Sequence, residues 1–193
     1  MIAVQLKRFK RYWMLLRIFL HRGGYKRAAF LKKKQFFKAQ GAHCYFQPWN
    51  FGTEPFLISF GDNVHVASGV VFVNHDVTAL MFRYMENDPS IRERRGEIRI
   101  GDNVFIGANS TVLYDVEIGD NVIIGAGSLV NKSIPSGTIA AGVPCRVIGK
   151  FDDYKTRSSA AAFPVRPEKM RPSRPIMQHN GRSGASGMVT AAC

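Results

Sequence analysis

Residues 100–135 read IGDNVFIGANSTVLYDVEIGDNVIIGAGSLVNKSIP and are the most regular part of the chain. Divided into sixes, they give IGDNVF, IGANST, VLYDVE, IGDNVI, IGAGSL and VNKSIP, and every six opens with Ile or Val. A period of six matches neither the repeat of an α-helix nor the alternation of a half-buried strand. It does match a three-sided coil, in which each six supplies one short strand and one corner and the opening residue points inward.

The same period occurs earlier in the chain. Phe60, Val66 and Phe72 open FGDNVH, VASGVV and FVNHDV. The glycine that follows the opening residue in many of the sixes suits a corner that a side chain would crowd. The step from Phe72 to Ile100 is 28 residues, which is not a multiple of six. Residues 77–99 are therefore expected to leave the coil as a loop.

Length and composition favour one domain with a sizeable core, because the chain has 193 residues and 46% of them are hydrophobic. Arg17 interrupts the longest apolar runs, so neither a membrane-spanning helix nor a secretory signal is expected. Cys44, Cys145 and Cys193 are an odd and scattered set, which argues against a disulfide framework and a CxxC metal site. A reducing, cytoplasmic setting is expected.

The net charge of +13 is concentrated at the two ends of the chain. Residues 1–40 contain 12 Lys and Arg and no Asp or Glu, whereas residues 41–154 contain 8 basic and 13 acidic residues. Residues 155–193 contain 7 basic residues and 1 acidic residue. This distribution argues against a nucleic-acid groove across the fold and favours a terminal arm attracted to an anionic surface, either lipid or polyanion.

The arm, residues 1–41, is expected to be helical. Residues 3–21 fit an amphipathic helix that ends at Gly23 and Gly24, and a second helix is expected over residues 25–40. The apolar stripe of the first helix could cap the open end of the coil, or it could bind the inner face of the membrane. The residues of this stripe are Leu6, Phe9, Trp13, Leu16 and Leu20. The tail, residues 152–193, loses the repeat and is expected to be disordered.

The repeats resemble those of the hexapeptide-repeat acyltransferases, a family with a left-handed parallel β-helix and an active trimer. IGDNVFIGANSTVLYDVEIGDNVIIGAGSLVNKSIPSGTIAAGVPCRVIGKF is similar to the coil and closing segment of galactoside, maltose and nodulation-type O-acetyltransferases. GTEPFLISFGDNVHVASGVVFVNHD is similar to acetyltransferases that modify capsules, O-antigens and exopolysaccharides. The resemblance covers residues 51–151. It implies an all-β domain over residues 42–151 that transfers acetyl from acetyl-CoA to a sugar or polysaccharide hydroxyl.

The resemblance also implies roles for particular residues. His75 corresponds to the family's general base, because it stands where the chain leaves the coil, and an imidazole can accept and return a proton near neutral pH. The backbone N–H of Ala108 would stabilise the oxyanion. Asn74 and Asp76 flank the base and would orient it or hold the acceptor. Glu54 corresponds to an acceptor-binding carboxylate, and a turn-capping role fits it equally well.

Acetyl-CoA is expected in a groove between subunits of a homotrimer, where small residues let the pantetheine approach the backbone and cations meet its phosphates. The residues implied are Gly107, Ala126, Gly127, Ala141, Lys132 and Arg146. The sequence departs from the relatives at Gly149, where some carry a basic residue, and at Tyr114-Asp115, where Pro-Gly is common.

Three other functions are alternatives to this reading. A metal enzyme on the same coil, of the γ-carbonic-anhydrase type, would need three histidines between subunits, and the coil contains only His65 and His75, so no metal is expected. An acetyltransferase that inactivates an antibiotic would share the fold, base and donor and differ only in the acceptor. A non-catalytic scaffold is the third. Thiol release from acetyl-CoA, measured with and without a glycan, would separate these functions.

Overall fold

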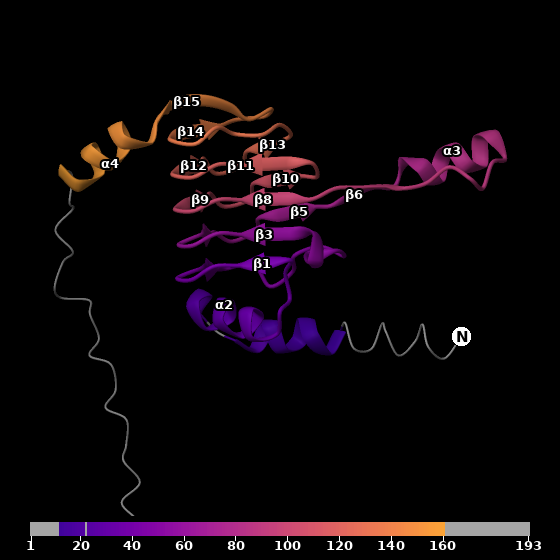
Figure 1. Cartoon of the computed structure of the whole chain (residues 1–193), viewed down its shortest axis with the longest axis horizontal. Helices are drawn as coiled ribbons and strands as arrows, with labels where there is room; N and C mark the ends of the chain where they lie inside the picture. The colour runs from indigo at the N-terminus through magenta and orange to yellow at the C-terminus, as the bar shows by residue number, and fades with distance from the viewer. Residues whose placement is uncertain (1–11, 22, 161–193) are drawn as a thin grey trace, which may run out of the picture. The chain divides into compact units, whose positions relative to one another are not determined.

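The computed structural model describes residues 12–21 and 23–160, and these residues form a coil of short parallel strands with helices at both ends (Figure 1). The coil has three flat sides, and the strands stack on each side as a sheet. The predicted β-helix is thus confirmed. The strands run from Ala39 to Lys150, so the coil begins slightly before the expected boundary at residue 42.

The strands form three sheets, which we call A, B and C, and three turns of the coil place one strand in each of them. Sheet A contains β1 (Ala39–Gln40), β3 (Ile58–Phe60), β8 (Ile98–Ile100) and β11 (Val116–Ile118). Sheet C contains β5 (Val71–Val73), β10 (Thr111–Leu113) and β13 (Leu129–Val130). Sheet B contains β2 (Tyr45–Phe46), β4 (His65–Val66), β9 (Val104–Ile106), β12 (Val122–Ile124), β14 (Thr138–Ala141) and the antiparallel β15 (Arg146–Lys150).

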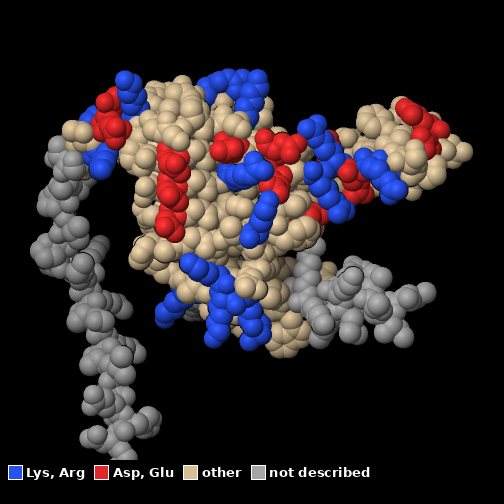
Figure 2. Space-filling model, viewed as in Figure 1, with Lys and Arg blue, Asp and Glu red and all other residues tan. Residues whose placement is uncertain are grey.

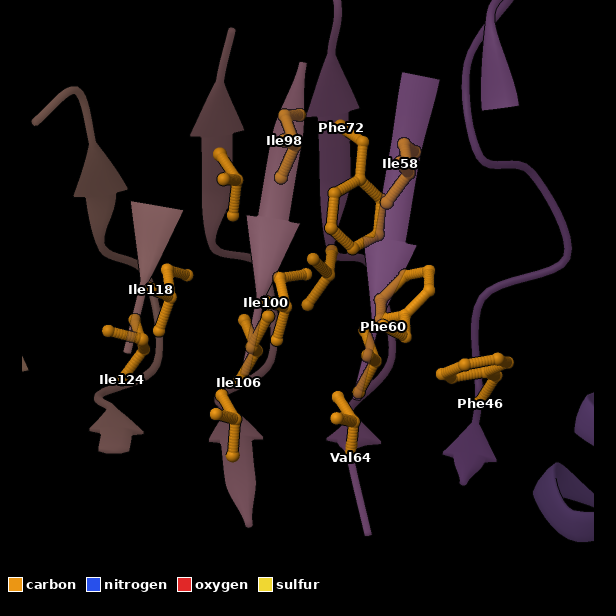
Figure 3. Close-up of a cluster of buried hydrophobic side chains, with 14 of the residues drawn as sticks. Phe46, Ile58, Phe60, Val64, Phe72, Ile98, Ile100, Ile106, Ile118 and Ile124 are labelled. Atoms are coloured by element: carbon orange, nitrogen blue, oxygen red, sulfur yellow. The ribbon is translucent and has the colours of Figure 1, made fainter. Parts of the chain in front are cut away.

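The residues that open the sixes form the core. Phe60 lies beside Ile100 in the sheet, and Ile100 lies beside Ile118, so equivalent positions of successive turns stack on one another (Figure 3). All nine opening residues from Phe60 to Val130 are at most 4% exposed. Near the N-terminal end of the coil the stack becomes aromatic, where Phe37 contacts Phe46 and Phe60 edge to face or nearly so.

The GDNV repeats mark the corner between sheets A and B, and the structure explains their aspartate, asparagine and glycine. The Asp62 N–H donates to Asp102 Oδ1 at 2.7 Å, and the Asp102 N–H donates to Asp120 Oδ1 at 2.7 Å, which makes a carboxylate ladder along this corner. The asparagine that follows each aspartate adopts the left-handed conformation. A Cβ on Gly101 would lie 2.2 Å from Asp120 Oδ1, so crowding explains this glycine, as predicted.

Where the six-residue repeat is interrupted, the chain forms an arm that projects from the coil (Figure 1). The chain leaves after β5 through β6 (His75–Asp76), forms the helix α3 (Thr78–Glu86), and returns through β7 (Arg94–Arg95), which pairs antiparallel with β6. The expected excursion over residues 77–99 is therefore present, but it is a helix on a two-stranded stem, and β8 has rejoined sheet A by Ile98.

Two helices cover the N-terminal end of the coil. The first occupies residues 12–20 of the described range, and the second, α2 (Gly24–Lys33), contacts β2. The second helix is shorter than expected, because Gln35 takes a positive φ of 48° and Phe37 turns into the core. Leu6 and Phe9 of the predicted stripe lie outside the described residues.

The tail begins with a helix. The prediction that residues 152–193 are disordered is wrong for its first part, because α4 spans Phe151–Ala160. Asp152 and Asp153 in the first turn of α4 favour this helix through its dipole. Residues 161–193 lie outside the described part of the chain. Within residues 12–21 and 23–160, no helix is both long and apolar enough to cross a membrane.

Candidate active site

His75 lies at the base of the arm, at the corner between sheets C and A. It belongs to β6, opposite Arg95 in the antiparallel pair, and its side chain is 29% exposed. Its Nδ1 lies 2.8 Å from Glu54 Oε2 and 3.3 Å from Thr53 Oγ1. Because a carboxylate can only accept a hydrogen bond, this contact places a proton on Nδ1 and leaves Nε2 as the atom able to accept one.

Glu54 contacts His75 directly, a contact that the sequence did not predict. We expected an acceptor-binding carboxylate or a turn cap, whereas the structure pairs Glu54 with His75, and the Thr53 hydroxyl donates to Glu54 Oε2. Glu54 is only 12% exposed and precedes the short 3-10 helix η1 (Pro55–Leu57). The three side chains form the chain of contacts in which a carboxylate orients an imidazole. The sequence signal was the adjacent pair Thr53-Glu54, one coil before His75.

Asn74 and Asp76 flank His75 in sequence, but no described hydrogen bond joins either side chain to the imidazole. Asn74 is 1% exposed, and its Nδ2 donates to the Gly96 carbonyl at 3.3 Å. Its Oδ1 is buried and has no hydrogen-bond partner among the described residues. A buried amide oxygen without a donor is costly, so this atom marks a strained point next to His75.

Asp76 holds the arm rather than the base. Its Oδ1 accepts a hydrogen bond from the Thr78 N–H at 2.8 Å, at the start of α3. The Tyr114 hydroxyl donates to its Oδ2 at 3.3 Å. The hydrogen bonds from Thr78, then those from Tyr114 and the charge of Arg94, lower the pKa of Asp76. Arg94 also pairs with Asp115 at 2.8 Å, so Tyr114-Asp115, the pair that departs from the family pattern, anchors the arm to the coil.

Ala108 lies at a different corner, between sheets B and C. It follows β9 in a tight turn, and its carbonyl accepts a hydrogen bond from the Gly127 N–H at 2.8 Å. In the same turn of the coil, seven residues separate Ala108 from Asp115, which lies at the His75 corner. At about 3.3 Å per residue, the three residues of β10 between the two corners span about 10 Å, and all seven residues span at most about 23 Å. His75 and Ala108 of one chain therefore cannot act on the same atom.

The predicted cofactor residues divide between the same two corners. Ala126 and Gly127 lie beside Ala108, and Ala141 and Arg146 pair with each other in β14 and β15 nearby. Lys132 follows β13 and so lies at the His75 corner, one turn above Tyr114. All of these residues are exposed or half-buried.

Gly107 has a packing role. It is buried, and a Cβ there would lie 2.4 Å from the backbone nitrogen of Ala126. Its small size therefore lets two turns of the coil approach each other, which is a different reason from the expected contact with pantetheine.

A groove runs beside the His75 corner along sheet A. Its walls combine the apolar Phe56 and Leu57 with charged side chains from the stem and sheet A. The charged lining residues are Arg95, Glu97, Arg99, Asp115 and Glu117. Glu97 bonds to Lys38 and Arg99, and these contacts lower its pKa. The groove is therefore a polar surface, suited to a ligand rich in hydroxyl groups.

The described residues contain no cluster of three or more His, Cys, Asp and Glu side chains able to bind a metal ion. His65 is in sheet B, where it stacks on Tyr45 with ring centroids 5.6 Å apart. It does not approach His75, which lies at a corner between the other two sheets.

Comparison with known proteins identifies the family. Residues 97–132 match the model for the bacterial transferase hexapeptide (six repeats). A galactoside O-acetyltransferase of Lactococcus lactis is 34% identical over an alignment of 148 residues, and the match covers 64% of this chain and 69% of that protein. The chain therefore belongs to the hexapeptide-repeat transferases, whose left-handed parallel β-helix is the fold described above.

One further curated relative and one solved structure are also similar to this chain. Protein CapG of Staphylococcus aureus is 48% identical over 109 residues, which are 55% of this chain. The match spans 60% of the length of CapG. The solved structure of a galactoside acetyltransferase in complex with coenzyme A is 26% identical, covers 80% of this chain and 85% of that chain, and has a TM-score of 0.55.

Proposed function

We propose that this protein is an acetyl-CoA-dependent O-acetyltransferase that acts on a sugar or polysaccharide hydroxyl, with His75 as the general base. The observation that carries the proposal is the contact between Glu54 Oε2 and His75 Nδ1, at the point where the chain leaves the coil. The names of the relatives support the reaction class, because they include galactoside O-acetyltransferases and one complex with coenzyme A.

The reaction needs one proton to move from the acceptor hydroxyl to the imidazole and then from the imidazole to the leaving thiolate. His75 Nε2 accepts the proton of the acceptor hydroxyl, and the oxygen attacks the carbonyl carbon of the acetyl thioester. The tetrahedral intermediate carries a negative oxygen, which the Ala108 N–H stabilises. When the C–S bond breaks, the imidazolium returns its proton to the leaving thiolate. Glu54 holds the ring and stabilises the imidazolium, as the carboxylate of a catalytic triad does.

The separation of the two corners supports a trimer. Because His75 and Ala108 lie at the two edges of sheet C, a complete site needs the His75 corner of one chain and the Ala108 corner of another. A threefold axis in front of sheet C and parallel to the coil brings these corners together three times. The outward side chains of sheet C are uncharged, in contrast to Arg99 and Glu117 on sheet A.

The acceptor is assigned to the polar groove beside the His75 corner. Sugars present many hydroxyl groups, and the charged lining of the groove offers them hydrogen-bond partners. The exposed cations Lys132 and Arg146 are assigned to the phosphates of the donor.

The experiment that tests the function is a screen of acceptors with acetyl-CoA. Mono- and oligosaccharides, polysaccharide repeat units and hydroxyl-bearing antibiotics are incubated with the protein, and products are read by mass spectrometry. The proposal expects a gain of one acetyl group on a sugar hydroxyl with one free thiol released per transfer. Transfer of acetyl only to the antibiotics would show that the acceptor is an antibiotic and not a sugar. Thiol release from none of the mixtures would contradict the proposal.

A further inference from the structure

The helix over residues 12–20 has apolar side chains on two opposite faces. One face packs on the coil through Ile18, which is 0% exposed, and Met14, which is partly buried against the core. The opposite face is between 48% and 63% exposed at every position. Its residues are Tyr12, Trp13, Leu16, Phe19 and Leu20, and we call this set the aromatic face. A helix with apolar side chains on two opposite faces is normally covered on both.

The aromatic face corrects one of the two alternatives drawn from the sequence. The stripe that contains Trp13, Leu16 and Leu20 was a candidate cap for the open end of the coil. The structure gives that role to Met14 and Ile18, and the stripe points away from the core. Capping and a second contact are therefore made by different faces of one helix.

The helix is held firmly, so the aromatic face is presented in a fixed orientation. Arg27 is buried, and its guanidinium donates to the Ile18 carbonyl at 3.2 Å and to the Phe46 carbonyl at 3.1 Å. Arg27 thereby joins the end of the helix to the first turn of the coil. At the same end, His21 stacks on Phe30 with ring centroids 4.2 Å apart.

The surroundings of the aromatic face are basic. The first acidic residue in the chain is Glu54, and residues 1–53 contain 12 Lys and Arg. Lys26, Lys32 and Lys33 of α2 and the adjacent Lys34 are exposed. In the view of Figure 2, blue gathers over α2 at this end of the coil, and the red rows lie on the body above it. Lys7, Arg8, Lys10, Arg11 and Arg22 belong to the same stretch of sequence and lie outside the described residues.

We infer that this end of the molecule docks on an anionic lipid surface through the aromatic face and the lysines of α2. Aromatic and aliphatic side chains enter the boundary between headgroups and acyl chains, and lysines are attracted to anionic headgroups. The inference goes beyond the proposed transferase activity and uses none of its residues. In the proposed trimer all three helices face the same end, so three docking faces act together.

Both tryptophans of the chain report on this surface. Trp13 belongs to the aromatic face, and Trp49 packs edge to face on Phe19 with ring centroids 6.3 Å apart. Both are about half exposed, at 50% and 49%. Docking moves both indoles from water into lipid headgroups. Their emission is expected to shift to shorter wavelength and to be quenched by brominated acyl chains.

The experiment uses the full chain with vesicles of phosphatidylcholine alone or mixed with phosphatidylglycerol. Flotation and tryptophan emission are measured at low and high salt. Binding is expected only to the phosphatidylglycerol vesicles and is expected to weaken with salt. Replacing Lys32, Lys33 and Lys34 with Gln is expected to weaken it about 100-fold, because each basic residue near the surface contributes roughly fivefold.

The second variant combines Trp13→Ser, Leu16→Ser and Phe19→Ser, and its expected result is loss of flotation with unchanged acetyl transfer to a water-soluble acceptor. The matched control combines Tyr154→Ser with Lys155→Gln and Arg157→Gln on α4, at the other end of the coil, and should bind like the unchanged chain.

The inference is overturned if the unchanged chain does not bind anionic vesicles, or if the serine variant binds them as well as the control does. Salt-sensitive binding that ignores the serine changes would indicate a general polyanion contact. Loss of a larger oligomer in the serine variant, without vesicle binding by the unchanged chain, would indicate that a second copy covers the face.

Discussion

At the scale of single residues, His75 and Glu54 are in direct contact, and we propose that they work as a pair. His75 could be selected from the sequence because it stands at a break in an otherwise strict repeat. The role of Glu54 could not, because the two residues are 21 positions apart and meet only when one turn of the coil stacks on the next. The same stacking leaves Asn74 Oδ1 buried without a partner among the described residues, which no sequence pattern signals.

Replacing His75 with Ala is expected to lower turnover by about 10²- to 10⁴-fold, the usual cost of a lost general base. Size and thermal unfolding should not change, because the side chain is partly exposed and outside the core. His65→Ala is the matched control, since His65 is the other histidine of the coil and lies in sheet B. Near-normal turnover in a well-folded His75→Ala protein would remove His75 from the mechanism.

Replacing Glu54 with Gln separates orientation from acceptor binding. A glutamine amide can donate to Nδ1 and stabilise the tautomer with the proton on Nε2, so kcat is expected to fall by about 10²- to 10⁴-fold. The KM for the acceptor should change little, and Glu54→Asp should recover part of kcat. Glu86→Gln at the end of α3 serves as the control. A raised acceptor KM with normal kcat would return Glu54 to the acceptor-binding role first expected for it.

At the scale of elements, the sequence predicts the coil and the position of the arm. It does not predict the helix of the arm or the contacts that hold the arm to the coil. The sixes predicted the inward residues because a three-sided coil leaves little choice of which residue faces in. The excursion was predicted because the step from Phe72 to Ile100 is not a multiple of six, but the helix within it was not predicted. The Tyr114–Asp76 and Arg94–Asp115 contacts join segments about 20 to 40 residues apart, which only the folded coil brings together.

The start of α3 depends on the ionised Asp76. Because hydrogen bonds lower the pKa of Asp76 in the folded protein, its contribution is present above the unfolded value of about 3.9 and is lost as the pH falls through the folded value. Asp76→Ala is expected to speed hydrogen exchange over residues 78–86 at neutral pH, and this difference should vanish in acid. Asp88→Ala at the far end of the arm is the control. Equal protection of α3 in all three proteins at neutral pH would contradict this account.

Close stacking of the coils makes Gly107 sensitive to a single methyl group. In Gly107→Ala the added Cβ would lie 2.4 Å from the Ala126 nitrogen, so two turns must separate. A loss of about 1–3 kcal/mol in stability is expected, as for other overpacked sites, and urea unfolding measures it. Gly149→Ala is the control, because its Cβ would meet only Ile139, at 3.8 Å. Equal urea midpoints for the Gly107→Ala and Gly149→Ala proteins would contradict this prediction, because they would show that the backbone at this corner adjusts to the added methyl group.

At the scale of the whole molecule, the two predicted halves of the site lie at opposite edges of sheet C. The sequence predicted a trimer only through resemblance, whereas the positions of His75 and Ala108 give a geometric reason for it. In the proposed trimer, the N-terminal helices of all three chains lie at one end and the arms project from the sides.

The measurement that tests the account most directly mixes two inactive chains. His75→Ala removes the base, and Ala126→Trp fills the exposed surface beside Ala108 while leaving His75 intact. If each site uses His75 from one chain and the Ala108 corner from its neighbour, every mixed trimer contains one intact site. Random assembly of equal amounts then restores about a quarter of the normal rate of acetyl transfer. A mixture that stays as inactive as its two components would contradict a site shared between chains.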